Sequence, residues 1–205
     1  MNKSGGRRDE RNRRWMRSRA AWTNVPARSV AILLLVLCGA PGTVPAELSE
    51  YDVKAAFLFH FAQFVEWPGE AFKDASSPLT YCTIGEDRFR GALDESVKGK
   101  SVGGRPLRVL HLKQREQIEG CQVVFVAIEE KKRLEETLAG AAGQAVLTVG
   151  ETEHFARDGG MIGFFLEENK VRFEINVDAA SKARLKISAK LLSLAKTVIG
   201  NSRGN

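Results

Sequence analysis

The sequence predicts a single α/β domain of three layers, with a mainly parallel sheet, helices on both of its faces and a C-terminal antiparallel hairpin. Three observations lead to this prediction. Apolar runs of strand length alternate with stretches of helix length between residues 79 and 157. The run 122–128 is almost entirely apolar, which is typical of a strand covered on both faces. Residues 161–167 and 170–177 flank Glu168-Asn169, a pair that favours a hairpin turn. The strand order stays open.

The first element of the domain, residues 50–66, is expected to be a helix that ends at Trp67-Pro68, because proline cannot continue the helical hydrogen-bond ladder. Glycines at 103–104 predict a turn, and Gly143 is expected to end a helix. The same patterns predict further helices at 88–97, 130–141 and 153–157, strands at 79–84, 107–112, 122–128 and 145–149, and two short C-terminal helices capped by Asp178 and Ser188.

Residues 1–46 have the pattern of a secretory signal peptide. Nine Lys and Arg residues precede an apolar stretch at 30–37, and Val44-Pro45-Ala46 offers small residues at a cleavable site. The alternative is a membrane anchor, but a membrane span needs roughly 20 apolar residues and this stretch is much shorter. We therefore expect cleavage of the signal peptide, export to the periplasm and a mature domain at 47–205.

The basic character of the chain belongs to this leader. Residues 1–46 hold 9 of the 31 basic and 2 of the 25 acidic residues, so residues 47–205 hold 22 basic and 23 acidic residues and a net charge of −1. A nucleic-acid partner, which a basic domain would indicate, therefore has no support from charge. The length of the mature part is sufficient for one domain with its own hydrophobic core.

The cysteine content fits an exported protein. Cys38 lies in the leader, which leaves Cys82 and Cys121 in the mature chain. An even pair in an oxidising compartment predicts a disulfide bond. The alternative is two unpaired buried thiols.

Sequence signatures of catalysis and of metal binding are missing from the chain. Gly99-Lys100-Ser101 resembles the end of a phosphate-binding loop, but Asp94 stands where that loop requires a glycine. Neither a nucleophile elbow nor a dinucleotide-binding glycine motif occurs. Three scattered histidines do not have the spacing of metal ligands. We predict a protein that is not an enzyme, with no catalytic residues, no metal site and no cofactor, and keep an envelope enzyme as an alternative.

The predicted first helix is the most informative segment, because apolar residues cover almost its whole circumference. Lys54 falls inside this apolar arc, so it either belongs to a ligand or partner site or is paired structurally, for example with Glu174. Phe59 stands within the narrow polar stripe that also carries Glu66. Phe59 and Trp67 are either core residues or aromatic anchors of an interface.

The C-terminal part offers a second candidate surface. Arg172, Glu174 and Asn176 alternate with apolar residues and therefore share one face of the second hairpin strand. This face is either simply solvated or a recognition surface of varied hydrogen-bonding groups. Lys190 lies on the polar side of the last predicted helix. We take these four residues, with Lys54, Phe59, Glu66 and Trp67, as candidates for binding a partner or a ligand.

Three stretches of the chain are similar to the YfiR family of periplasmic regulatory proteins. They are KAAFLFHFAQFVEWP at 54–68, GGMIGFFLEENKVRFEIN at 159–176 and LKISAKLLSLAKTV at 185–198. The placement of Cys82 and Cys121 also resembles the disulfide of that family. The resemblance extends from about Tyr51 to Val198, nearly all of the predicted mature domain.

The resemblance to this family implies that the chain regulates another protein. The best-known member of the family holds an inner-membrane diguanylate cyclase inactive through the cyclase's periplasmic domain, and release of this repression raises cyclic di-GMP and promotes biofilm. The resemblance thus implies such a cyclase or a sensor kinase as partner, and a possible homodimer. Some relatives carry a second, local cysteine pair that this chain lacks, so a redox switch built on that pair is not expected.

Two hypotheses from different classes follow. In the first, the chain is a regulatory binding protein that contacts its partner through Phe59, Trp67 and the polar hairpin face. In the second, it is a sensor of a small, unidentified ligand, with a pocket between the first helix and the hairpin that uses Lys54, Arg172 and Glu174.

Overall fold

A twisted sheet of eight strands forms the centre of the domain. The computed structural model describes residues 49–113 and 118–200, which belong to one compact unit, Glu47–Asn205. The order of the strands in the sheet is β10-β8-β7-β6-β5-β2-β4-β3. Five neighbouring strands run parallel: β4 (Arg105–Leu112), β2 (Leu79–Gly85), β5 (Val123–Ala127), β6 (Leu147–Gly150) and β7 (Ile162–Glu167).

The central strands β2, β5 and β6 are buried almost throughout, as their apolar composition predicts. Successive side chains point to opposite faces, so Tyr81 and Phe125 join one hydrophobic cluster while Cys82 and Val126 join the other. Two separate apolar layers therefore flank the sheet.

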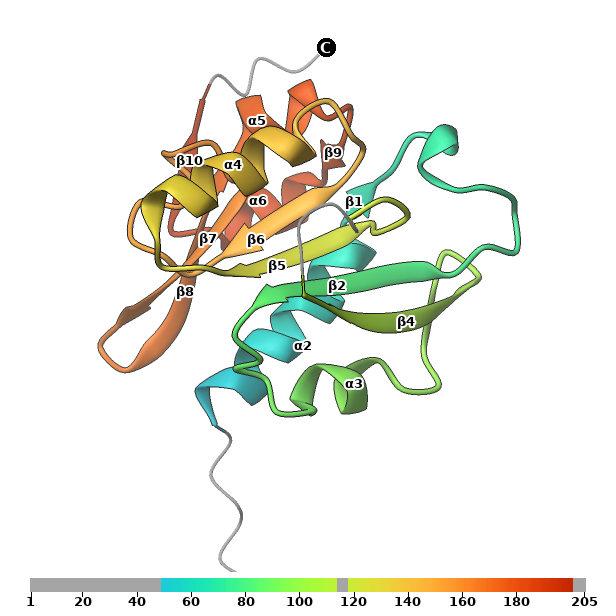
Figure 1. The fold of residues 1–205 in the computed structure, drawn as a ribbon, viewed down its shortest axis with the longest axis horizontal. Coiled ribbons are helices and arrows are strands. Elements are labelled where there is room, and N and C mark those ends of the chain that lie inside the picture. The colour runs from blue at the N-terminus through green and yellow to red at the C-terminus, as the bar shows by residue number, and fades with distance from the viewer. Residues whose placement is uncertain (1–48, 114–117, 201–205) are drawn as a thin grey trace, which may run out of the picture. The chain divides into compact units, whose positions relative to one another are not determined.

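Helices cover both apolar layers. α2 (Glu50–Gln63), α3 (Ala92–Val97) and α6 (Ala189–Leu194) contribute to the larger cluster, and α4 (Lys131–Ala141) packs on the opposite face. Figure 1 shows α4 in front of the sheet and α2 behind it. The short helix α5 (Val177–Lys182) follows β8 directly. The predicted three-layer α/β class is confirmed.

The C-terminal hairpin is also confirmed. β7 pairs antiparallel with β8 (Lys170–Asn176) around the turn residues Glu168 and Asn169, which both adopt positive φ angles of 50° and 58°. β10 (Thr197–Ile199) then joins β8 in parallel and ends the sheet on that side. In Figure 1 the tip of the β7–β8 hairpin projects beyond the helices.

The predicted disulfide is confirmed as well. Cys82, in the middle of β2, is bonded to Cys121, just before β5, with their Cα atoms 5.9 Å apart. The bond closes a loop with a sequence separation of 39 residues, so it fastens the chain that crosses from β4 to β5 onto the centre of the sheet. A loop of this size contributes about 4 kcal/mol in the chain-entropy model.

Some elements differ from the predictions. α2 ends at Gln63, three residues early, because residues 65–66 leave the helix to form β1 (Val65–Glu66), which pairs antiparallel with β9 (Lys186–Ile187). The segment 153–157 forms turns instead of a helix. Asn176, not Asp178, caps α5, by accepting a hydrogen bond from the backbone N–H of Ala179 at 2.9 Å. Ser188 caps α6 as predicted.

Candidate functional site

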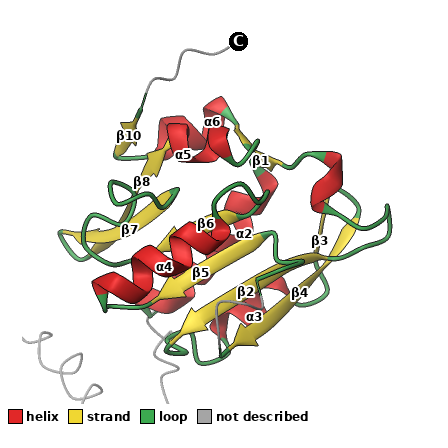
Figure 2. Ribbon diagram, turned by 45° about the horizontal axis from the view of Figure 1, so that its top comes forward, coloured by secondary structure: helices red, strands yellow, loops and turns green. Residues whose placement is uncertain are grey.

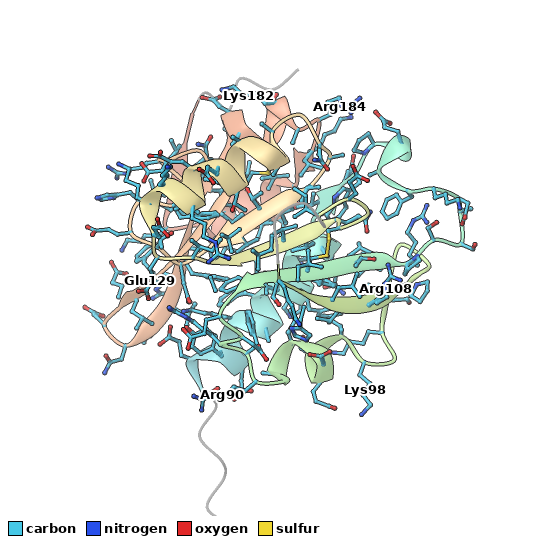
Figure 3. The ribbon with its side chains drawn as sticks, in the orientation of Figure 1. Arg90, Lys98, Arg108, Glu129, Lys182 and Arg184 are labelled. Atoms are coloured by element: carbon cyan, nitrogen blue, oxygen red, sulfur yellow. A yellow bond between two sulfur atoms is a disulfide. The ribbon has the colours of Figure 1, made fainter. Side chains whose placement is uncertain are left out.

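A cluster of charged side chains lies where three parallel strands end. Arg88 follows β2, Glu129 follows β5 and Glu151 follows β6 directly. Figure 2 shows the arrowheads of β2 and β5 side by side, and Figure 3 labels Glu129 at this end of the sheet. The carboxyl ends of parallel strands are the usual position of binding sites in open α/β sheets. The first turns of α2 reach the same place, because Tyr51 and Lys54 contact Glu151.

Lys54 is the buried centre of this cluster. Its side chain is only 4% exposed, and its Nζ is paired with Glu50, one turn earlier on α2, and with Glu151. Nζ also lies 4.6 Å from the centre of the Tyr51 ring. Burial alone lowers the pKa of Lys54, but the hydrogen bonds to Glu151 and Glu50 outweigh it, so the pKa lies above its usual value. The ammonium is therefore charged, and both Glu50 and Glu151 bind it.

Arg88 connects the carboxylates of the cluster. Its guanidinium pairs with Glu151 at 3.0 Å, with Glu129 at 2.5 Å and with Glu86 at 3.3 Å. The hydrogen bond to Glu129 is the main cause that raises the pKa of Arg88. Glu151 thus holds two cations, Lys54 on Oε2 and Arg88 on Oε1. Its Oε1 also accepts a hydrogen bond from the Tyr51 hydroxyl at 2.9 Å.

A groove of about 690 Å³ opens beside this cluster, between the start of α2 and the β7–β8 hairpin. Lys54, Arg88 and Glu151 line one wall, and Phe165, Glu167 and Glu174 of the hairpin line the other. The groove thus offers both signs of charge, together with the apolar side chain of Phe165. Such a mixture suits a polar or zwitterionic ligand or a polar segment of a partner.

The hairpin residues named from the sequence occupy different environments. Glu174 is half-buried and lines the groove, whereas Arg172 pairs with Glu167 at 3.7 Å and is not among the lining residues. The amide of Asn176 donates to the carbonyl of Ala156 at 2.7 Å while its oxygen caps α5. The suggested pairing of Lys54 with Glu174 is wrong, because Glu50 and Glu151 take that place.

The other candidates lie away from the groove, around the far half of α2. Trp67 is half-buried and donates its indole N–H to the backbone carbonyl of Gln122 at 3.3 Å. Glu66 is exposed on β1, and the Lys190 ammonium lies 5.0 Å from the centre of the Phe64 ring. Nine helical residues, or about 13 Å, separate Lys54 from the end of α2.

Phe59 lies between the two ends of α2, and its side chain is half-buried. The ammonium of Lys100 lies 4.4 Å from the centre of its ring. Of the eight candidates, the structure therefore brings Lys54 and Glu174 to one groove. The other six do not line it: Phe59, Glu66, Trp67, Arg172, Asn176 and Lys190.

Sequence reasoning missed Arg88 and Glu151, which hold the cluster together. One signal was available: each residue comes within four positions of the end of a predicted strand, where binding residues gather in parallel sheets. A second constellation also went unnoticed. His111 lies 3.0 Å from the Thr83 hydroxyl and 3.3 Å from Asp94. Thr83 is buried in β2, so its side chain is barely exposed to solvent.

No group of three or more potential metal-binding side chains occurs within residues 49–113 and 118–200. In the same ranges, no helix has both the length and the apolar character of a membrane span.

Two solved structures are similar to this fold. A conserved domain protein from Vibrio cholerae O1 biovar El Tor has a TM-score of 0.50 and 13% identity, with 74% of this chain and 61% of the other covered. The ABC domain in complex with L-Trp from Streptococcus pneumoniae has a TM-score of 0.43 and 9% identity, with 59% and 55% covered. This chain thus spans less than two thirds of either structure. The Vibrio structure supports the fold alone.

Fold and site together define an α/β domain with a charged groove at the carboxyl end of its parallel strands. The family model described as YfiR/HmsC-like matches residues 51–196. The chain belongs to the YfiR/HmsC-like family, a family of periplasmic regulatory proteins, as the three sequence stretches predict.

Proposed function

We propose that this protein, exported by a cleaved signal peptide at 1–46, represses an inner-membrane diguanylate cyclase or a related sensor protein by binding its periplasmic domain. Family membership supports a regulatory role. We choose the β7–β8 hairpin as the surface that contacts the partner, because it projects from the domain (Figure 1). A hairpin that extends beyond its own helices has side chains available for another protein.

The hairpin has the composition of a small interface. Leu166 is 54% exposed, so a large apolar side chain of the hairpin faces the solvent. Next to it in sequence, Glu167 pairs with Arg172 at 3.7 Å and with Lys196 at 3.0 Å. An exposed apolar residue beside charged groups is the arrangement of an interface centre and its polar rim. We place the partner contact on this hairpin and leave Trp67, which packs at the far end of α2, out of it.

Substitution of Leu166 tests this proposal. Leu166→Glu places a charge at the centre of the proposed contact and is expected to raise cyclic di-GMP as strongly as deletion of the gene, in cells that contain the partner cyclase. The exposed Ala139→Glu on α4, on the opposite face of the sheet, is the control and should keep repression. Unchanged cyclic di-GMP in the deletion strain would contradict the regulatory role, and normal repression by folded Leu166→Glu would contradict the hairpin surface.

A second candidate function is the sensing of a small ligand in the groove beside Lys54. The specific observation is the mixed lining of Lys54, Arg88, Glu151 and Glu174 in a volume of about 690 Å³. Thermal-shift measurements with amino acids, vitamins and nucleotides separate the two functions. A ligand that raises the melting temperature of the protein, but not of Glu174→Ala, supports the sensor; no shift with any of these compounds contradicts it.

A further inference from the structure

The strand β4 leaves a long open edge on one side of the sheet. β3 (Ser101–Val102) pairs only with Arg105 and Pro106 at the start of β4. From Arg108 onwards, no segment within the described ranges pairs with the outer side of β4, whereas its inner side pairs with β2 as far as Leu112. Figure 2 shows this edge at the side of the sheet opposite β10. Open edges of this kind are templates for an added strand.

The backbone orientation of β4 identifies the groups available for pairing. The N–H of Leu107 points outward, because it donates to the carbonyl of Lys100 at 3.3 Å. Backbone groups alternate in direction along a strand, so the N–H and C=O groups of Val109 and His111 also point outward, while those of Arg108 and Leu110 face β2. Two successive sets of backbone donors and acceptors are therefore open to an incoming strand.

The side chains along this edge are basic or apolar. Between residues 105 and 113 the sequence contains Arg105, Arg108, His111 and Lys113 and no carboxylate. Figure 3 shows Arg108 at the β4 side of the molecule, and its guanidinium donates to the Thr80 hydroxyl at 3.2 Å without a carboxylate partner among the described residues. Asp94 of α3, 3.3 Å from His111, is the carboxylate in contact with this edge. Leu110, between the basic residues, is 36% exposed.

We propose that the outer edge of β4 binds an extended, acidic segment of a partner protein by strand addition. Backbone hydrogen bonds to Val109 and His111 would hold the segment, a carboxylate would pair with Arg108, and an apolar side chain would contact Leu110. This surface is separate from the β7–β8 hairpin, which lies beyond β6, β5 and β2 in the sheet order. The inference therefore goes beyond the proposed function and does not depend on it.

The basic charge of the β4 edge favours an acidic partner segment over a second copy of the chain and over residues 1–46. Two copies of the chain that paired β4 with β4 would bring two edges that carry Arg105, Arg108 and Lys113 and no carboxylate against each other, and like charges across a ladder destabilise it. The segment 1–46 of the chain itself carries 9 basic and 2 acidic residues, so it is repelled as well. An acidic segment removes the repulsion and gains the charge pairing. A basic edge that serves only to prevent self-association would bind no strand at all.

Backbone hydrogen exchange tests the proposal directly. The probe is an acetylated ten-residue peptide in which glutamate alternates with valine, added to the purified protein, and exchange is followed by NMR. We expect the exchange of the Val109 and His111 amides to slow by about ten-fold or more when the peptide binds. Val109→Pro removes one outward N–H and is compatible with an edge position, so it should keep the fold and weaken peptide binding by about ten-fold.

Charge reversal provides the second variant. Arg108→Glu is expected to reverse the charge preference of the β4 edge. The glutamate peptide should bind more weakly, and a peptide in which lysine replaces glutamate should bind measurably. Leu166→Glu, on the hairpin, should bind the glutamate peptide as the unchanged protein does. No added protection at Val109 and His111 at millimolar peptide overturns the proposal and leaves the edge as a guard against self-association. Equal binding by Arg108→Glu overturns the charge pairing.

Discussion

The two ends of α2 are anchored by different forces. At the N-terminal end, Lys54 is held by Glu50 and Glu151, and the helix is tied to the sheet by charge. At the C-terminal end, Phe61 is completely buried, and its ring centre lies 5.0 Å from that of Phe173 and 5.6 Å from that of Phe164. One helix therefore combines an electrostatic attachment beside a groove with an apolar attachment inside the core.

The difference indicates which end is able to respond to a partner. Aromatic packing in a core is insensitive to salt and pH and fixes the position of the helix. A charged cluster beside an open groove is able to exchange one carboxylate partner for another, because Arg88 is 25% exposed there and contacts three carboxylates. The groove end is thus the part of α2 where binding could be transmitted to the helix.

The largest effect is expected at the apolar end. Phe61→Ala removes a ring with no exposed surface that packs against Phe57, Phe164 and Phe173, so the free energy of unfolding should fall by about 4 kcal/mol. Urea denaturation measures the loss, which should be the same at low and high salt. The exposed Gln63→Ala, two residues later, is the control and should change stability little. A small or salt-dependent loss for Phe61→Ala would contradict the apolar attachment.

A smaller loss of stability, measured in the same urea denaturation, is expected at the charged end. Glu151→Ala takes away a partner of both Lys54 and Arg88 and leaves a buried ammonium with Glu50 alone, so stability should fall by about 3 kcal/mol. Glu153→Ala, two residues later and 89% exposed at its side chain, is the matched control and should cost less than about 0.5 kcal/mol. If the two variants were equally stable, the charged attachment would be refuted.

The pH dependence separates the two ends further. The pKa of Lys54 is raised in the folded protein above its ordinary value of 10.5. The unfolded chain therefore releases this proton first, and the stabilisation is present below about pH 10.5 and is lost as the pH rises through the folded pKa. Denaturation midpoints should fall more steeply above this pH in the unchanged protein than in Lys54→Met. Parallel curves for the two proteins would show that Lys54 does not stabilise the fold through its charge.

Elements that depend on local composition could be predicted from the sequence, whereas elements that depend on contacts between distant residues could not. The buried strands could be predicted from local composition, as 122–128 shows, because burial on both faces requires apolar residues at every position. The strands β1, β3 and β9 have only two residues each, so they have no periodicity and exist only because tertiary contacts align them. Such strands could not be predicted.

The same distinction applies to the site. Lys54 was recognised because an ammonium inside an apolar arc conflicts with the helical pattern. Its main partner, Glu151, lies 97 residues further along the chain. Choosing Glu151 over Glu174 requires the order of the strands, which places β6 beside β5 and leaves β8 two positions away from β6. No feature of the sequence supplied that order.

An intermediate effect is expected at the first residue of the charged end. The Ser49 hydroxyl accepts a hydrogen bond from the N–H of Asp52 at 3.2 Å, and the Asp52 carboxylate accepts one from the N–H of Ser49 at 2.8 Å. Ser49→Ala should lower stability by about 1 kcal/mol, since it leaves a helical N–H without its cap. Ser49→Thr keeps the hydroxyl and serves as the control. Equal losses for both variants would indicate that the hydroxyl does not stabilise the start of α2.

The smallest effect is expected between the two ends, at Phe59. Lys100→Ala removes the ammonium that lies 4.4 Å from the Phe59 ring centre and should lower stability by about 0.5 kcal/mol. Lys100→Arg keeps a cation over the ring and should recover most of that loss. The loss should disappear in a Phe59→Leu background, because a double-mutant cycle isolates the contact. If Lys100→Ala were equally costly in both backgrounds, Phe59 would be free of this contact, and its half-buried ring would have to be explained by packing alone.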